Sequence, residues 1–266
     1  MKGPDVSYKH LTIERSDHIA TITMNRPEAL NALDRGLTRD MHMAIEELSG
    51  EFPDIRVVIL TGAGRGFCSG ADVMAQARGL TPSEPEPHDP LNSIPPLAPE
   101  LQAMPQPVIA AVNGVAAGAG FSLAMASDIR VAAESSRYSV IFVKRSLVPD
   151  TGSSHSLPAV VGRGTAMEMA LTGRVYDAAW AFERGLVNYV VPDDQVLAEA
   201  RVLASEIANN PPLCVQSIKQ LMHRTDRLAE VLPYEHDANT PSMNTADRRE
   251  AVMSFVEKRD PVFVGR

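Results

Sequence analysis

Apolar residues alternate with polar ones at the start of the chain and then recur with the period of a helix. Between residues 8 and 24 the alternation is interrupted at Ser16-Asp17, which predicts two strands joined by a turn. From Leu33 onward, apolar residues recur every three or four positions, as on one face of an amphipathic helix. A compact apolar run at 54–60 predicts a third strand. Strand, helix and strand in this order favour an α/β fold in which helices cover a sheet.

The later part of the chain has two more kinds of pattern, short apolar runs followed by longer helical ones. The run at 108–112 predicts a buried strand, and 121–126 predicts a short apolar helix. Further short strands are expected at 129–132 and 138–140. The helices expected after them cover residues 165–171, 178–184, 195–208, 214–223 and 245–258. The carboxy-terminal half is therefore expected to be mostly helical.

The stretch from about residue 79 to 107 interrupts these patterns with many prolines and several acidic residues. A regular helix is not expected to run through it, because proline lacks the amide hydrogen and clashes with the preceding turn. Both flanks look like parts of one core, so we interpret the stretch as a surface loop rather than a linker between domains. Its position just after a glycine-rich segment makes it a candidate lid.

Composition narrows the classes of function. The chain has 266 residues, 44% of them hydrophobic, which suits a globular protein with a sizeable core. A net charge of −8 with scattered basic residues argues against nucleic acid or an anionic membrane as a partner. Cys68 and Cys214 are far apart and lack metal-ligand spacing, so we expect neither a disulfide framework nor a metal site. No apolar targeting or membrane-spanning segment is evident, and a cytoplasmic location is expected.

Two glycine-rich segments, 66–72 and 113–120, each follow a β-branched run and each precede a helix-like stretch. Free backbone N–H groups at such a junction can bind an oxygen that gains negative charge during a reaction. The alternative is that the small residues merely allow tight turns and close packing of helices. No carboxylate lies between Gly114 and Ser127, so the second segment carries no acid of its own.

Asp150 is the candidate acid or base. It lies in the run Leu147-Val148-Pro149-Asp150-Thr151-Gly152, where it could also serve as a turn or helix-cap residue. His155 follows closely, but a Ser-His-Asp triad is not expected, because groups so close in one turn seldom face one another. An aspartate is a weak base, so partial burial in a substrate pocket would help Asp150 to act.

A glycine-rich run and four cationic side chains are the candidates for phosphate binding. The run 62–66 is only a weak match to a nucleotide-binding loop, since no Lys-Ser/Thr pair follows it. The side chains that could meet phosphate groups are Arg26, Arg65, Lys258 and Arg259.

Five motifs resemble those of the crotonase, or enoyl-CoA hydratase/isomerase, superfamily and occur in the same order. They are the runs 25–33, 67–73, 107–114, 171–173 and 247–259, which span nearly the whole chain. The resemblance implies a crotonase-like spiral of ββα units over residues 1–200 and a helical trimerisation region over 201–266. It also implies an acyl-CoA thioester as ligand, no separate cofactor, and assembly as a homotrimer or a dimer of trimers.

The resemblance further assigns the site. Ala71 and Ala119 would supply the two amides of an oxyanion hole, and Asp150 would be the catalytic acid and base. The residues expected to bind the substrate are Arg26, Glu28, Ala29, Leu30, Ser69, Asp72, Val73, Val115, Gly118, Ser122, Phe142, Leu147, Pro149, Phe255 and Lys258.

Two departures from the family pattern decide the expected chemistry. Hydratases of the family activate water with two glutamates, whose positions carry Ser122 and Phe142 here. Hydration needs a general acid and a general base, so we expect it to be severely reduced. Asp150 lies where several isomerases of the family place a single acid, which favours movement of a double bond through an enolate. The alternatives are hydrolysis, with Asp150 attacking or activating water and His155 assisting, and a non-catalytic acyl-CoA binder.

Overall fold

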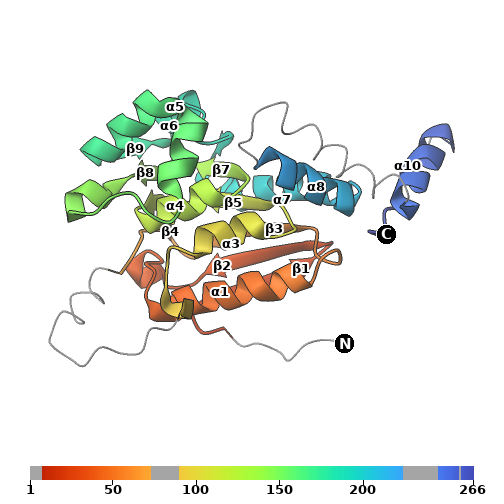
Figure 1. The fold of residues 1–266 in the computed structure, drawn as a ribbon, viewed down its shortest axis with the longest axis horizontal. Coiled ribbons are helices and arrows are strands. Elements are labelled where there is room, and N and C mark those ends of the chain that lie inside the picture. The colour runs from red at the N-terminus through yellow and green to blue at the C-terminus, as the bar shows by residue number, and fades with distance from the viewer. Residues whose placement is uncertain (1–7, 73–89, 224–244, 258) are drawn as a thin grey trace.

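The computed structural model describes residues 8–72, 90–223, 245–257 and 259–266. Two sheets form the centre of this part of the chain, and helices cover them (Figure 1). The larger sheet has six strands in the order β1-β2-β3-β5-β7-β10, of which only β1 and β2 are antiparallel neighbours. Their bounds are Leu11–Ser16, Ile19–Met24, Val57–Gly62, Val108–Val112, Ile129–Ala133 and Tyr189–Val191.

The smaller sheet has four strands in the order β4-β6-β8-β9, with bounds Gly66–Cys68, Val115–Ala117, Arg137–Ser139 and Tyr176–Asp177. Three successive pairs, β3 with β4, β5 with β6 and β7 with β8, each give one strand to each sheet. A helix, α4 (Ala119–Ala126), follows the second pair, and α5 (Ser153–Thr172) follows the third. The repeated ββα units that the family resemblance implies are therefore present.

Both faces of the larger sheet are buried at the central strands β3 and β5, whereas β1 and β10 at the edges are partly exposed. Alternate residues of a strand point to opposite faces. On β3, Val58 and Leu60 join one core cluster, together with residues of α1 (Arg35–Gly50), α3 (Leu97–Ala103) and α4. Val57 and Ile59 join a second cluster with α7 (Val196–Ala208). A sheet covered on both faces needs apolar residues at nearly every strand position, which explains the continuous apolar runs at β3 and β5.

The helix predicted from Leu33 is α1, and its start is fixed by a side chain. Asp34 is the N-cap, and its Oδ1 accepts a hydrogen bond of 2.8 Å from the Leu37 N–H. Short 3-10 helices connect other elements: η1 (Pro27–Ala29), η2 (Pro90–Asn92), η3 (Ile141–Arg145) and η4 (Asp193–Gln195).

The stretch 79–107 is not a loop throughout. Residues 79–89 lie outside the described residues, but Leu97–Ala103 forms α3, whose Leu97 and Leu101 are fully buried. The prediction of an irregular loop was wrong here, because Pro99 sits in the first turn, where its missing N–H would have had no helical partner. The buried His42 of α1 links α1 to α3 and the residues before it. Its Nδ1 lies 2.6 Å from Glu100 Oε2, and its Nε2 lies 2.8 Å from the Ser93 carbonyl oxygen.

The carboxy-terminal half is mostly helical, as predicted. α5 contains two helical pieces that meet at Gly162, and the predicted helix at 165–171 is the second of them. The boundary predicted after residue 200 falls inside α7, which covers the sheet as one helix. α6 (Ala178–Glu183), α8 (Pro212–Met222) and α10 (Ala246–Glu257) complete the described helices. α10 lies apart from the main body, at the end of the molecule opposite α5 and α6 (Figure 1).

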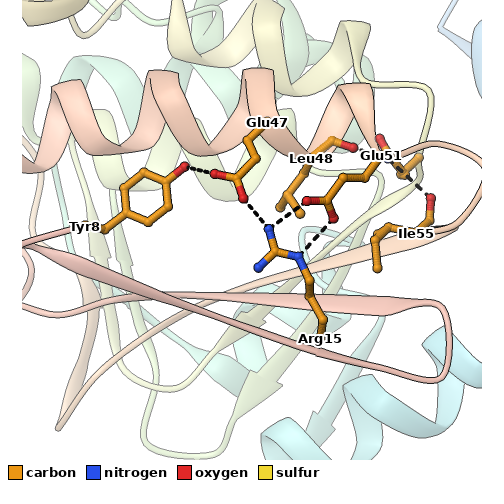
Figure 2. Close-up of polar contacts among 7 residues, drawn as sticks. Tyr8, Arg15, Glu47, Leu48, Glu51 and Ile55 are labelled. Atoms are coloured by element: carbon orange, nitrogen blue, oxygen red, sulfur yellow. Dashed lines mark hydrogen bonds and ion pairs between the residues drawn. The ribbon is translucent and has the colours of Figure 1, made fainter. Parts of the chain in front are cut away.

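Two clusters of charged side chains join elements that are distant in sequence. On the surface, the Arg15 guanidinium of β1 donates to both Glu47 and Glu51 of the α1 region, and the Tyr8 hydroxyl donates to Glu47 (Figure 2). Arg15 is about one-third exposed, with 35% of its side chain accessible. This surface cluster links the first strand to the helix above it.

The second cluster surrounds Asp128, which follows α4; Lys219 is buried, Asp128 is largely buried and His223 is partly exposed. The Lys219 ammonium of α8 lies 3.1 Å from Asp128 Oδ2 and donates to the carbonyl oxygens of Leu101 and Gln106. His223 Nε2 lies 2.6 Å from Asp128 Oδ1, and the Val108 N–H donates to Oδ2. Burial would by itself raise the pKa of Asp128, but His223 and Lys219 outweigh it and lower that pKa.

Candidate active site

The two glycine-rich segments lie side by side. β4 and β6 are parallel neighbours in the smaller sheet. A Cβ atom added to Gly70, whose φ is +96°, would lie 2.7 Å from the Ala117 carbonyl oxygen and 3.3 Å from the Ala119 nitrogen. One added to Gly120 would lie 2.2 Å from the Cys68 carbonyl oxygen. Glycine is therefore required at both positions, because the two backbones approach too closely for any side chain.

The Ala71 amide faces away from Leu33, its neighbour in an isolated β-bridge. Gly70 and Asp72 on either side of it bond to one partner: the Leu33 N–H donates to the Gly70 carbonyl (2.8 Å), and the Asp72 N–H donates to the Leu33 carbonyl (3.0 Å). Successive groups of an extended backbone point to opposite sides, so the Ala71 N–H faces away from Leu33. Within the described part of the chain this N–H meets no hydrogen-bond acceptor.

The Ala119 amide is the first of α4. Residues in a helix's first turn have no intrahelical partner for their N–H groups, and the helix dipole makes this end attractive to negative charge. The preceding Gly118 N–H donates to the Ser139 carbonyl oxygen (3.1 Å), whereas among residues 8–72 and 90–223 no acceptor meets the Ala119 N–H. Two unpaired amides on adjacent segments are what an oxyanion hole requires, and this role of Ala71 and Ala119 stays a prediction.

Arg26 fixes the first segment from the side of η1. Its guanidinium lies 3.1 Å from Asp72 Oδ2 and 3.3 Å from Asp34 Oδ2, and it also donates to the Ala32 carbonyl oxygen. Arg26 is therefore ion-paired within the chain, and its contact with a phosphate group stays a prediction. The buried Asn31 completes this scaffold, because its amide donates to the Gly66 carbonyl oxygen at 2.8 Å.

Asp150 is exposed, and its backbone is held firmly against α4. Its carbonyl oxygen accepts hydrogen bonds from the Ser122 hydroxyl (3.1 Å), the Ser153 hydroxyl (2.8 Å) and the Ser153 N–H (3.0 Å). Ser122 lies one turn after Ala119, so the same helix carries the predicted oxyanion amide and holds the predicted acid. Within the described part of the chain, the Thr151 hydroxyl is the one donor to the Asp150 carboxylate. The partial burial that would help Asp150 to act as a base is not present, since Asp150 is exposed, as are residues 143–148 before it.

Nearly the whole chain matches one known protein family. The sequence profile described as enoyl-CoA hydratase/isomerase matches residues 14–266. The chain belongs to the enoyl-CoA hydratase/isomerase family. The ββα spiral described above is thus the crotonase fold that this family shares.

Relatives within the family carry different names. The 1,2-epoxyphenylacetyl-CoA isomerase of Escherichia coli (strain K12) is 38% identical over 93% of this chain and 95% of its own length. The 2,3-dehydroadipyl-CoA hydratase of the same strain is 36% identical over 96% of this chain and 99% of its own length. A crystal structure of enoyl-CoA hydratase from Bacillus anthracis has a TM-score of 0.91 at 33% identity, covering 97% of this chain and 100% of that one. Similarity alone therefore does not separate isomerase from hydratase.

Ser122 and Phe142, which the family resemblance aligns with the hydratase glutamates, carry no acid. Ser122 is fully buried, and its hydroxyl is shared between the carbonyl oxygens of Gly118 and Asp150. Phe142 is 5% exposed and joins the core from η3. Neither side chain can take up a proton from water at neutral pH.

The other predicted substrate-binding residues fall into three groups. Ala29 and Leu30 lie beside the first glycine segment, since their carbonyl oxygens accept hydrogen bonds from Ser69, while Glu28 of η1 is exposed. Val115 is half-buried in β6, Gly118 caps α4, Leu147 is exposed and Pro149 is half-buried. Val73, Lys258 and the side chain of Phe255 lie outside the described residues.

The remaining predicted polar residues take part in no cluster with Asp150. His155 is exposed in the first turn of α5, and its ring makes no hydrogen bond to the residues that the structure describes. Arg65 is exposed. Arg259 is paired with Glu250 and Glu257, so it is not the free cation that was expected, and its hydrogen bond lowers the pKa of Glu250 to about 2.

The carboxy-terminal family motif has a structural role that the sequence did not reveal. Asp247 is buried at the start of α10, and its carboxylate accepts hydrogen bonds from the N–H groups of Val264 and Gly265. Glu250 accepts another from the Val262 N–H. The acidic residues of this motif therefore hold the last residues of the chain against α10, which spacing along the sequence could not indicate.

Both cysteines of the chain lie among the described residues. Cys68 and Cys214 are free thiols, and burial raises the pKa of Cys68 to about 12, so this thiol stays protonated. No group of three or more His, Cys, Asp or Glu side chains that could hold a metal ion occurs there. None of the helices in that part is long and apolar enough to cross a bilayer.

Proposed function

We propose that this protein moves a double bond within an enoyl-CoA, with Asp150 as its single acid and base. The observation that carries the proposal is the placement of Asp150. Its backbone carbonyl is bound by Ser122, on the helix that begins with the Ala119 amide. An acid and an oxyanion site fixed by one short helix can act on adjacent atoms of one substrate.

The proposed reaction transfers one proton and conserves every atom. The Asp150 carboxylate removes a proton from C2 of a 3-enoyl thioester, and the electron pair moves into the thioester carbonyl to give a dienolate. The N–H groups of Ala71 and Ala119 donate to the enolate oxygen and stabilise it. Asp150 then returns the proton to C4, which leaves the conjugated 2-enoyl thioester. A single carboxylate suffices, because the same oxygen atom can accept and then donate the proton.

The absence of acids at Ser122 and Phe142 supports isomerisation over hydration. Adding water requires one group to deprotonate the water and another to protonate the carbon. At the two positions that do this in family hydratases, this chain has the hydrogen-bonded hydroxyl of Ser122 and the buried ring of Phe142. The relative named 1,2-epoxyphenylacetyl-CoA isomerase is consistent with an isomerase reaction on this scaffold, although that name describes another substrate.

The products formed from a 3-enoyl-CoA test the proposal. We expect a rise in absorbance at the conjugated enoyl band and a product of unchanged mass. A main product that has gained water would show a hydratase, and free CoA would show a hydrolase. Tight binding without any product would show an acyl-CoA binder. Each of these three results would contradict the proposed function.

A further inference from the structure

Thr151 has an unusual backbone conformation next to the predicted acid. Its φ is +49°, and among the described residues it is the only β-branched residue with a positive φ. A β-branched side chain in this region clashes with its own backbone, so Thr151 is a real outlier. Strained residues of this kind persist where the surrounding structure holds them, and they concentrate at functional sites.

The Thr151 side chain uses this conformation to reach the Asp150 carboxylate. Thr151 is 3% exposed, and its hydroxyl donates a hydrogen bond of 2.8 Å to Asp150 Oδ1. It does not cap the following helix, because Gly152 is the N-cap of α5 and no side chain caps it. The hydroxyl is therefore directed at the neighbouring carboxylate and not at the helix end.

The bond to Oδ1 distinguishes the two carboxylate oxygens. Oδ2 of Asp150 accepts no hydrogen bond from the part of the chain that the structure describes. A carboxylate oxygen that already accepts a hydrogen bond is the weaker proton acceptor of the two. Proton exchange with a substrate is thus directed to Oδ2.

The backbone of Asp150 is fixed separately from its carboxylate. Three hydrogen bonds, from Ser122 and Ser153, converge on its carbonyl oxygen. They set the position of the Cα atom but leave rotation about the side-chain bonds free. Thr151 supplies the missing restraint, since it is the residue whose hydroxyl bonds to the carboxylate.

We propose that Thr151 is a positioning residue that orients the Asp150 carboxylate so that Oδ2 exchanges the proton. This inference rests on the proposed function, in which Asp150 is the acid and base. It adds that the strained turn exists to direct one oxygen of that acid at the substrate.

Thr151→Val is the main test, with Thr151→Ser as its matched control. Valine keeps the β-branched shape and the backbone strain but has no hydroxyl, whereas serine keeps the hydroxyl. Turnover of a 3-enoyl-CoA is measured for both variants, together with KM and thermal unfolding. We expect Thr151→Val to lower kcat roughly 10- to 100-fold while KM stays within about twofold. Thr151→Ser should keep kcat within about threefold of the wild type.

The outcomes separate this inference from the proposed function. Wild-type protein without isomerase activity, or a fully active Asp150→Asn variant, would refute the proposed function and this inference with it. An inactive Asp150→Asn variant combined with a fully active Thr151→Val variant would refute the role of Thr151 alone. If Thr151→Ser lost as much activity as Thr151→Val, the side chain would serve packing and the inference would also fail. Should Thr151→Val fail to fold, Thr151→Ala replaces it under the same criteria.

Discussion

Asp128 and Asp150 are two aspartates next to the same helix, α4, and they are held in opposite ways. Asp128 follows the end of α4, and its carboxylate is saturated by Lys219, His223 and the Val108 N–H. Asp150 lies against the first turns of α4, where its backbone carbonyl takes the hydrogen bonds and its carboxylate is left with one donor. In the first arrangement the carboxylate itself is held in place. In the second the backbone is held, and the carboxylate remains able to exchange a proton.

The difference shows how two aspartates near one helix can serve stability and chemistry separately. A buried carboxylate with a full set of donors cannot give up its charge without loss of the structure around it. An exposed carboxylate on a fixed backbone can be protonated and deprotonated at little structural cost. We therefore expect substitutions at the Asp128 cluster to change the free energy of unfolding, and substitutions at Asp150 to change turnover.

Removing Lys219 should have the largest effect on stability. Lys219→Met leaves the Asp128 carboxylate and two carbonyl oxygens buried without their cation, which should lower the free energy of unfolding by about 3–5 kcal/mol. Urea unfolding at one protein concentration measures this. Gln220→Met, at the adjacent exposed position of α8, is the matched control and should change it by less than about 0.5 kcal/mol. Equal losses in the two variants would show that the Asp128 cluster does not stabilise the fold.

The Asp128 cluster also predicts a pH dependence. Because the pKa of Asp128 is lowered in the folded state, its ionised form adds stability above the ordinary pKa of an aspartate, about 3.9. That stability is lost as the pH falls through the folded pKa. Asp128→Asn should therefore be less stable than the wild type by about 2 kcal/mol at pH 7, and the gap should narrow below about pH 4.

Unfolding curves of both proteins from pH 7 to pH 3 give this comparison. A gap that stays constant over the whole range would mean that the charge of Asp128 does not matter, and that only its shape does.

The surface cluster around Arg15 should show the smallest effect. Its guanidinium bonds to Glu47 and Glu51, but all three side chains are in contact with water (Figure 2). Arg15→Gln should lower the free energy of unfolding by less than about 1 kcal/mol, and high salt should reduce the difference further. A loss as large as that of Lys219→Met would break the distinction between buried and exposed charge clusters.

Much of this architecture could be predicted from local pattern. The apolar runs gave β3, β5 and β7, and the three-to-four-residue period gave α1. The two glycine-rich segments also indicated where the two candidate amides lie. The backbones approach so closely at Gly70 and Gly120 that only glycine fits, and this requirement is visible in the sequence.

What local pattern could not supply was pairing between distant residues. Arg26 looked like a free cation because Asp72 is 46 positions away, and Lys219 looked like an ordinary helix residue because Asp128 is far earlier in the chain. α3 was not predicted because it contains Pro99. A proline argues against a helix unless it is known to lie in the first turn. Thr151 left no signal either, because a positive φ at threonine contradicts the residue's ordinary preference.

The central claim is that Asp150 performs proton transfer while the fold is held elsewhere, and Asp150→Asn tests it most directly. The variant keeps the backbone carbonyl that Ser122 and Ser153 bind. Turnover of a 3-enoyl-CoA, affinity for a saturated acyl-CoA and the free energy of unfolding are measured together. We expect kcat to fall by roughly 100- to 10,000-fold, with affinity within about twofold and stability within about 0.5 kcal/mol of the wild type. Full activity in the variant would contradict the account.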